Sequence, residues 1–396
     1  MMRIRSALLL VAGCPLAERA LSAQEPGVTP PPAVVVESLP PSDYPWLLSY
    51  YPMIGGGLGG GPVVIARARY WQPSPYEARS TYRADLTVEG GLGFHGSRMG
   101  LIRLRAPLLS RNLRVNARLG ARRNTRENFF GLGNETVLEK DLPAEERLRY
   151  RVEEVRYQAL ADITHRIAGP LHISVGGGVE NTRFAALVEE GPTLFESTFG
   201  AELEDTDAIG GATLVLDTRD NEFDPTTGVV VESGVQFGSG GDGYSRVYGM
   251  ARGYRMLGAR HQVAVRLAAS QLYGDPPLSA LYELPAWEDV LGMYGGHSTN
   301  RGLRSSRYLG TGVIFGNVEL RRELLTSKNS AELQAYIYLD AGRVFHGEKI
   351  RLTADELHVG AGGGLALRFL RSTSVAFDVA RGSDGIRFNI GSGWAF

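Results

Sequence analysis

The chain has 396 residues, with 42 lysine and arginine residues against 43 aspartate and glutamate residues. This length suits two average soluble domains or one large β architecture. The balanced charge excludes the basic excess that is typical of nucleic-acid-binding proteins, so no nucleic-acid partner is expected. Glycine contributes 51 residues without the three-residue period of collagen, which favours a chain with many strands and turns.

Residues 1–23 have the pattern of an export signal, because Arg3 and Arg5 precede an apolar run and small residues follow up to Ala23. Two processing routes are open. Cleavage after Ala23 would give a mature protein that starts at Gln24, and we predict this route. Residues 11–14, VAGC, also resemble a lipoprotein signal that would lipidate Cys14, the only cysteine.

Residues 24–60 are rich in proline and cannot form a central strand, so they predict an extended linker or plug. An aromatic group near the end of this segment suits either an interfacial anchor, which we favour, or part of the first strand and plug. Its members are Tyr44, Trp46, Tyr50 and Tyr51. No later stretch approaches the roughly 20 apolar residues that a membrane-spanning helix needs.

From residue 61 to residue 396, apolar and polar side chains alternate in stretches of roughly ten residues between turn residues, which is the strand pattern. In residues 113–121, leucine, valine and alanine share one face, and arginine and asparagine share the other. A soluble sandwich would bury the apolar face, whereas a transmembrane barrel would turn it to lipid. The export signal, the many strands without an internal repeat and the aromatic last strand favour the barrel. We therefore predict an all-β fold, a transmembrane antiparallel β-barrel of about 16 strands with a lumenal loop.

Residues 295–324, GGHSTNRGLRSSRYLGTGVIFGNVELRREL, begin as a glycine-rich cationic loop and continue as a strand. Strand alternation places Glu319 on the lumenal face, and Asp340 has the same position on the following strand. The fork of an arginine is well matched to paired carboxylates. We therefore expect Arg301, in the loop, to contact both carboxylates.

At these residues the chain resembles the C-terminal barrel of the BamA/TamA superfamily of outer-membrane assembly and translocation proteins, also called the bacterial surface antigen family. In that family, a loop with Gly-Gly and Arg-Gly-aromatic folds into the lumen, where its arginine contacts a glutamate and an Asp-x-Gly on the next strands. The same order occurs in Gly295-Gly296, Arg301-Gly302, Glu319 and Asp340-Ala341-Gly342. Residues 216–228 and 128–136 are similar to two further motifs of the family. Leu303 departs from the pattern, since the family prefers an aromatic residue there.

The resemblance implies two functional groups of residues. The first is a loop latch, made of Arg301, Gly302, Glu319, Asp340 and Gly342. The second is a C-terminal assembly signal, made of Phe388, Ile390, Trp394 and Phe396, which the barrel-assembly machinery would recognise. The sequence places these four aromatic and aliphatic side chains on one face of the last strand.

The resemblance also implies location in the bacterial outer membrane, contact with its lipid, and help with inserting or translocating proteins or lipids. The family's assembly factors carry periplasmic POTRA domains before the barrel, for which residues 24–60 are too short. We therefore expect a barrel over residues 61–396 without POTRA domains. A separate periplasmic protein that supplies such a module is left open as a partner. The alternative is a passive pore or structural barrel.

No motif points to catalysis, a cofactor or a metal ion. Residues 217–224 hold several aspartates but lack the spacing of a calcium loop, so turn chemistry explains them better. The seven histidines show no metal-ligand spacing, and the glycine runs do not lead from a strand into a helix. A Ser/His or His/Asp pairing in space is left open by the sequence, but we predict that the protein is not an enzyme.

Overall fold

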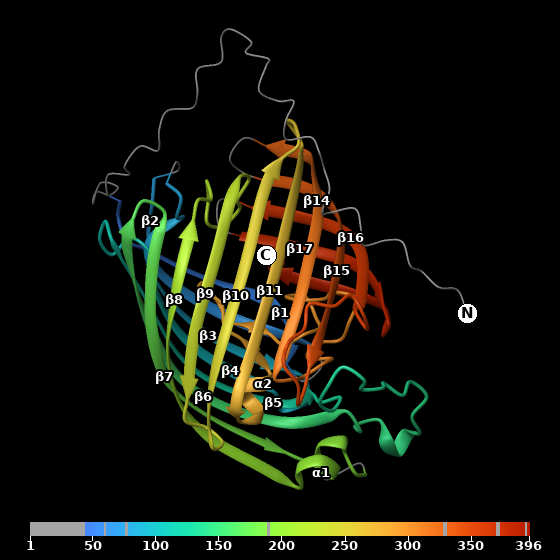
Figure 1. The fold of residues 1–396 in the computed structure, drawn as a ribbon. Coiled ribbons are helices and arrows are strands. Elements are labelled where there is room, and N and C mark those ends of the chain that lie inside the picture. Colours follow the sequence, from blue (N-terminus) through green and yellow to red (C-terminus); the bar gives the residue numbers. More distant parts are fainter. Residues whose placement is uncertain are drawn as a thin grey trace.

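The computed structural model describes residues 44–58, 61–75, 78–187, 191–327, 331–369, 373–392 and 394–396. Within these residues, sixteen strands form one antiparallel sheet in which each strand pairs with its neighbours in chain order (Figure 1). The sheet curls into a nearly closed barrel, which confirms the predicted fold class. The export signal, Cys14 and the proline-rich segment up to residue 43 lie outside the described residues.

The strands follow one another around the barrel in the order of the chain. The strands of the first half of the barrel are β1 (Leu47–Leu58), β2 (Gly61–Pro73), β3 (Tyr82–Gly93), β4 (Arg98–Ala106), β5 (Leu113–Asn128), β6 (Arg151–Ala168), β7 (Leu171–Ala185) and β8 (Glu202–Asp217). Those of the second half are β9 (Gly228–Gly238), β10 (Gly243–Met256), β11 (His261–Asp275), β14 (Gly312–Ser327), β15 (Ala331–Phe345), β16 (His358–Phe369), β17 (Thr373–Gly382) and β18 (Gly385–Ser392). The connections contain the ribbon β12 (Glu283–Leu284) and β13 (Leu291–Gly292), the helices α1 (Leu194–Phe199) and α2 (Leu278–Leu281), and the 3-10 turns η1 (Phe94–Gly96) and η2 (Ala144–Glu146).

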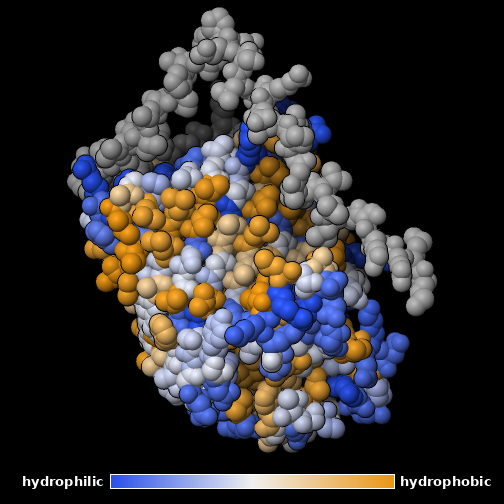
Figure 2. Space-filling model, in the orientation of Figure 1, coloured by the Kyte–Doolittle hydropathy of each residue, from blue (hydrophilic) through white to orange (hydrophobic). Residues whose placement is uncertain are grey.

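The two faces of each strand follow the predicted alternation, because successive side chains of a strand point to opposite sides. On β11, Leu267 points outward and its neighbour Arg266 is buried in the lumen. On β14, Val318 and Leu320 point outward and Glu319 points inward. Figure 2 shows the result as an apolar region over the upper half of the visible barrel face. An apolar outer band around a polar interior is the pattern of transmembrane β-barrels.

No helix in the described part of the chain is both long and apolar enough to cross a membrane.

The barrel begins earlier than the predicted boundary at residue 61. β1 pairs with β2 from Leu47 opposite Trp71 to Leu58 opposite Gly61, so the end of the proline-rich segment is a strand. Pro52 fits within β1 because this strand is an edge of the sheet, where a missing N–H is tolerated. Tyr50 and Tyr51 belong to this strand, which favours the first-strand interpretation of the aromatic group.

The long connections of the barrel lie at one end, because the strands alternate in direction. They comprise residues 129–150, 186–201, 276–311 and 346–357. Residues 276–311, which we call the lumenal loop, leave β11 at this end and fold back into the barrel before β14. The largest buried apolar cluster lies between this loop and the wall, and it includes Tyr282, Tyr294 and Leu303. Leu303 is therefore buried although it departs from the family's aromatic preference.

Candidate functional site: the lumenal loop and the C-terminal segment

Arg301 lies at the centre of the lumenal loop's contacts with the barrel wall. Its Nε donates to Asp340 Oδ2 at 2.9 Å, and its Nη2 donates to Asp340 Oδ1 at 2.7 Å. Its Nη1 donates to Glu319, and the ring of Tyr338 lies under the guanidinium, 3.4 Å from Cζ to the ring centroid. The three charged side chains are at most 1% exposed. The structure thus brings together the three ionic residues of the predicted latch.

Gly302 and Gly342 belong to the same site because a side chain would not fit at either position. A Cβ on Gly302 would lie 2.8 Å from Gly360 Cα of β16 and 3.0 Å from the Arg381 carbonyl oxygen of β17. A Cβ on Gly342 would lie 2.5 Å from the carbonyl oxygen of Ile314. Glycine at these positions lets the loop approach the wall, as expected for Gly302, and lets β15 pack closely on β14.

The latch also contains two asparagines, which the sequence motif did not include. Asn317 Nδ2 donates to Asp340 Oδ1 and to the carbonyl oxygen of Thr299, both at 2.7 Å. Asn389 of β18 donates to the carbonyl oxygen of Arg301 at 3.2 Å. Strand alternation does place both asparagines on the lumenal face, but it does not indicate which loop residue each one contacts.

The carboxylate partners of Arg301 keep its guanidinium protonated. Burial by itself lowers the pKa of this guanidinium, but Asp340 and Glu319 outweigh burial and raise the pKa above its ordinary value. Arginine therefore stays protonated in the lumen. Removing one member of a buried ion pair leaves the other charge uncompensated. The loss of any one of the three charged residues would therefore leave a buried charge without a partner.

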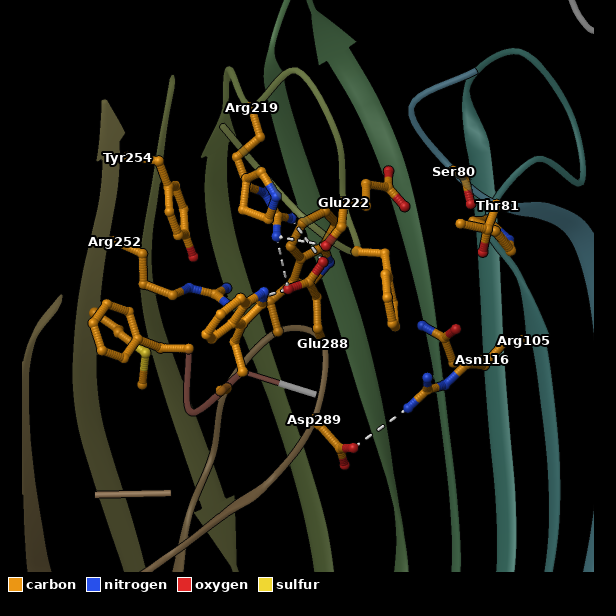
Figure 3. A pocket seen from close by; sticks show the side chains of 18 of the residues that line it. Ser80, Thr81, Arg105, Asn116, Arg219, Glu222, Arg252, Tyr254, Glu288 and Asp289 are labelled. Atoms are coloured by element: carbon orange, nitrogen blue, oxygen red, sulfur yellow. Dashed lines mark hydrogen bonds and ion pairs between the residues drawn. The ribbon is translucent and has the colours of Figure 1, made fainter. Parts of the chain in front are cut away.

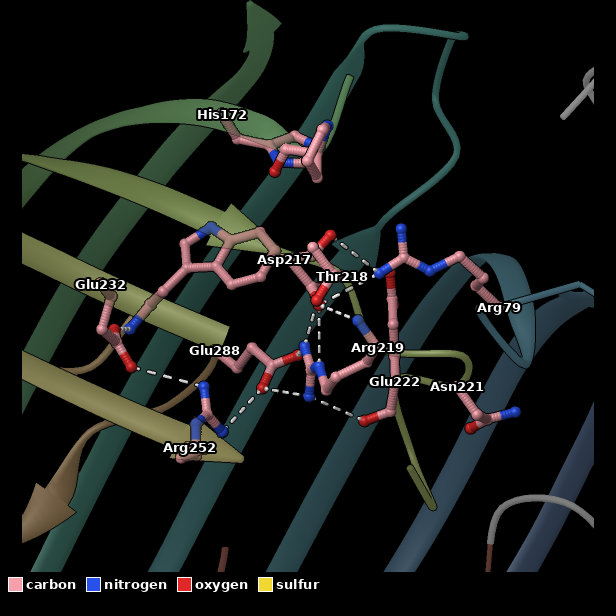
Figure 4. A network of polar contacts seen from close by, with 12 residues as sticks. Arg79, His172, Asp217, Thr218, Arg219, Asn221, Glu222, Glu232, Arg252 and Glu288 are labelled. Atoms are coloured by element: carbon pink, nitrogen blue, oxygen red, sulfur yellow. Dashed lines mark hydrogen bonds and ion pairs between the residues drawn. The ribbon is translucent and has the colours of Figure 1, made fainter. Parts of the chain in front are cut away.

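A second anchor lies at the tip of the lumenal loop, residues 285–290. Glu288 Oε1 accepts a hydrogen bond from Arg219 Nη2 at 2.7 Å, and its Oε2 accepts one from Arg252 Nη1 at 3.1 Å (Figure 4). Asp217, on the other side of Arg219, accepts from Arg219 Nη2 at 3.0 Å. Burial raises the pKa of Glu288, but the two arginines outweigh it and hold the pKa well below its usual range.

The residues around Arg219 have a role beyond turn chemistry. Turn chemistry is confirmed, because Asn221 Oδ1 accepts hydrogen bonds from the backbone of Phe223 and Asp224, and Gly228 has a φ of 104°. The sequence reasoning missed that this turn also receives the loop tip. Since this turn lies at the end of the barrel opposite the long connections, the lumenal loop reaches through the lumen.

The four residues of the expected C-terminal signal do not share a face. Phe388 and Ile390 point outward, as expected. The placement of Trp394 and Phe396 on that face is wrong, because both side chains lie in the lumen. Trp394 Nε1 donates to Asp224 Oδ1 at 2.9 Å. The ring centroid of Phe396 lies 4.7 Å from Arg266 Cζ. β18 ends at Ser392, so strand alternation no longer governs the residues that follow it.

Arg321 and Arg266 join the lumenal loop to this C-terminal segment, residues 394–396. Glu319, which holds Arg301, also accepts from Arg321 Nε at 2.7 Å, and Arg321 Nη2 donates to the Phe396 carbonyl oxygen at 3.2 Å. Arg266 donates to the carbonyl oxygen of Ser298 in the loop at 2.6 Å and to that of Ala395 at 3.1 Å. The loop and the chain end are thus held by the same two wall strands, β11 and β14.

Within the described residues, no group of three or more histidine, cysteine, aspartate or glutamate side chains is arranged to hold a metal ion.

Comparison with known proteins places this architecture in a family. The Omp85 superfamily domain matches residues 83–394. The fold is similar to that of BamA from Haemophilus ducreyi lacking POTRA domains 1–3, with a TM-score of 0.54 and 12% identity over 88% of this chain and 75% of that one. It is also similar to CdiB from Escherichia coli, with a TM-score of 0.54 and 13% identity over 88% of this chain and 66% of that one. No curated protein sequence matches the chain. Because the family match spans most of the barrel, the chain belongs to the Omp85 superfamily.

Proposed function

We propose that this protein is a bacterial outer-membrane barrel that assists the insertion or translocation of proteins or lipids, and that the seam between β1 and β18 is its working element. The observation that carries this proposal is the state of the seam. β1 and β18 are the two ends of the sheet and lie next to each other, yet no ladder of paired residues joins them within the described part of the chain. Unpaired strand edges can template an incoming strand.

Three local features support a weak seam. Pro52 removes one backbone donor from β1, and the chain leaves the sheet after Ser392, so β18 is short. Gly391 has no side chain to pack against a neighbour, and a Cβ there would lie 2.6 Å from His297 Nε2 of the lumenal loop. The loop thus packs directly against the last strand. Each feature lowers the free energy needed to separate the two edges.

The lumenal loop and the C-terminal segment are the proposed closing device. Arg301 fixes the loop on β14 and β15, and Arg321 and Arg266 fix the chain end on the loop side of the lumen. Opening the seam would release the C-terminal segment while the loop latch keeps the rest of the barrel intact. The proposed work is non-enzymatic, with outer-membrane lipid, the barrel-assembly machinery during biogenesis and a separate periplasmic protein as partners.

Site-specific photo-crosslinking tests the seam. A photoreactive phenylalanine analogue is placed at Phe388 on β18, which is 80% exposed, and at Phe237 on β9, which is 60% exposed and paired on both sides. In cells, the probe at Phe388 should capture outer-membrane barrel precursors, whereas the control at Phe237 should capture none. Equal capture at both positions would show that contact with precursors is unrelated to the seam.

A passive pore or structural barrel is the competing function. The observation in its favour is the polar lumen, which contains two cavities of about 370 and 330 Å³ beside the loop tip. The two functions differ in what the lumenal loop does. In a pore, the loop shapes a permanent channel, whereas in an assembly factor it keeps the lumen shut.

A further inference from the structure

The two lumenal cavities share the tip of the lumenal loop as a common wall. Residues 286–289 line both cavities, one of which also contacts the C-terminal segment. Arginine side chains surround this tip. Among the described residues that line the two cavities, seven are arginines and four are aspartates or glutamates. Positive charge is therefore in excess at this place, although the chain as a whole is nearly neutral.

The lining arginines that lack a close carboxylate lie mainly on β4 and β5. Three others have one: Arg219 and Arg252 hold Glu288, and Arg114 Nη2, at the start of β5, lies 2.7 Å from Glu222. Arg266 of β11 instead donates to carbonyl oxygens of the lumenal loop and the C-terminal segment. By contrast, Arg103 of β4 stands directly opposite Arg118 of β5 in the strand register. Like charges directly opposite each other in an antiparallel pair are destabilising. We call Arg103, Arg105 and Arg118 the arginine wall.

Asp289 is the weakly bound counter-charge of the arginine wall. Its carboxylate lies 3.4 Å from Arg105 Nη2 and 3.9 Å from Arg118 Nη1, and its side chain is 57% exposed (Figure 3 shows the Arg105 contact). Arg103 forms no ion pair within the described residues. This arrangement is the reverse of the latch, where one arginine has two buried carboxylates.

The other carboxylates near the wall have partners of their own. Asp85, opposite Arg105 in the register, is paired with Arg69, and Glu89 lies 2.6 Å from Arg67 Nη2. Asp162 accepts a hydrogen bond from Asn116 Nδ2 at 3.0 Å. The charge of the arginine wall is thus incompletely balanced by the protein, in a cavity wide enough for a small ligand.

We propose that the arginine wall is a binding site for a phosphate-bearing anion, and that Asp289 occupies the site in its absence. Arginine forks match the tetrahedral oxygens of phosphate, and the acceptor oxygens of one phosphate group can satisfy several guanidinium groups that one carboxylate reaches only at long range. The phosphate can come from a soluble ion or from the headgroup of an anionic lipid. This site is distinct from the seam and does not depend on the function proposed for it.

Isothermal titration of the full-length protein in neutral detergent, with inorganic pyrophosphate as the probe, tests the site. Arg103→Gln combined with Arg118→Gln should weaken binding roughly tenfold or more, because charge-assisted hydrogen bonds are lost. Asp289→Asn should instead tighten binding several-fold, because the internal competitor is neutralised. Arg260→Gln combined with Arg322→Gln, and Asp141→Asn alone, change exposed side chains away from the cavities and serve as charge-matched controls. Heat-modifiability on gels verifies that each variant is folded.

The source of the phosphate is tested by native mass spectrometry with added phosphatidylglycerol or phosphatidylcholine. Phosphatidylglycerol adducts that are lost in the double arginine variant and increased in Asp289→Asn would assign the site to an anionic lipid. The same pattern with pyrophosphate alone would assign it to a soluble anion. If Arg103→Gln/Arg118→Gln weakens the binding of neither ligand more than Arg260→Gln/Arg322→Gln does, or if Asp289→Asn does not tighten binding, the proposed site is wrong.

Discussion

Arg301 shows how one side chain can determine the position of a long loop. Its guanidinium reaches two strands at once, and its backbone N–H donates to Asp340 Oδ2 at 3.0 Å. Because these groups are buried, their ionic contacts are little screened by solvent. The latch and the loop tip are two separate anchors on different parts of the wall, so predictions at the residue scale can address them one at a time.

Arg301→Ala and Asp340→Ala should each destabilise the folded barrel by about 3–5 kcal/mol, because each leaves a buried charge without its main partner. The double variant should be little worse than either single one, since the same contact is lost in all three. Urea titration of the heat-modifiable form measures these losses. Arg322→Ala, which removes an exposed arginine from β14, is the control and should have little effect. Additive losses would mean that the two residues act independently and that the latch does not exist.

Gly302→Ala should loosen the lumenal loop, because its Cβ would collide with the backbone of β16 and β17. Overpacking of this kind typically costs about 1–3 kcal/mol. The control is Gly100→Ala on β4, where a Cβ would meet nothing within 4 Å. Limited proteolysis of folded protein should cut the loop faster in Gly302→Ala only. Equal protection of both variants would show that the close approach is not needed.

The contribution of Glu288 to stability should depend on pH. Its pKa is depressed in the folded protein, so its stabilising effect is present above the unfolded-state pKa of about 4.3 and is lost as pH falls towards the folded-state pKa. Glu288→Gln should therefore be less stable than the wild type above about pH 5, with a difference that narrows under more acidic conditions. Thermal gel-shift curves over a pH series measure this difference, and Glu145→Gln, at an exposed position, should show none. A pH-independent difference would exclude the charge of Glu288 as its cause.

At the scale of elements, β18 and the segment after it have different tasks. β18 keeps the outward alternation of a lipid-facing strand, whereas the C-terminal segment turns inward and contacts charged residues of the lumen. The change occurs where the chain leaves the sheet, since backbone pairing no longer fixes which way the side chains point. The expected assembly signal therefore combines residues of two environments.

Deletion of Phe396 should lower the amount of protein in the outer membrane with little effect on export, if the chain end is read during assembly. Loss of lumenal contacts could have the same effect, so Asp224→Ala is the matched variant: it keeps all C-terminal residues and removes the acceptor of Trp394 Nε1 without touching the latch. Quantitative blots of membrane fractions should show reduced levels for the deletion and normal levels for Asp224→Ala. Equal reduction in both would assign the effect to docking in the lumen.

At the scale of the whole molecule, the barrel is a sheet with two free edges and an interior occupied by one of its own loops. The lumenal loop reaches from the end with the long connections to the turn that carries Arg219 at the other end, where Glu288 meets Arg219 (Figure 4). The wall, the loop and the C-terminal segment meet at Glu319 and Arg266. The contacts of the loop and those of the chain end therefore lie side by side on β11 and β14.

Removal of residues 296–311 should convert a closed barrel into a conducting one. In planar bilayers, the intact protein should show small and intermittent conductance, whereas the deletion variant should show large and steady conductance because Arg301 and the part of the loop that it fixes are absent. A large steady conductance in the intact protein would favour the passive pore. Heat-modifiability of the deletion variant verifies that the barrel itself has formed.

The sequence by itself determined the barrel and the ionic members of the latch. A strand has a two-residue period, so alternation in 113–121 and around Glu319 indicates which side chains face the lumen without knowledge of any neighbour. The ordered motif from Gly295 to Gly342 then indicated which lumenal charges meet. The sequence left most of β1 in a linker, because its proline is typical of a linker and is accommodated in a sheet at an edge strand.

The tertiary structure alone decided the contacts of the lumen outside the latch. The contact of Glu288 with Arg219 joins residues of a loop and a distant turn, and nothing local in either segment specifies the other. The inward turn of Trp394 likewise follows from Asp224 and Arg321 being within reach. The arginine wall depends on the register of β4 against β5, which sets Arg103 opposite Arg118. Such contacts arise from barrel closure, which brings together side chains far apart in sequence, whereas periodicity reports only the face on which each side chain lies.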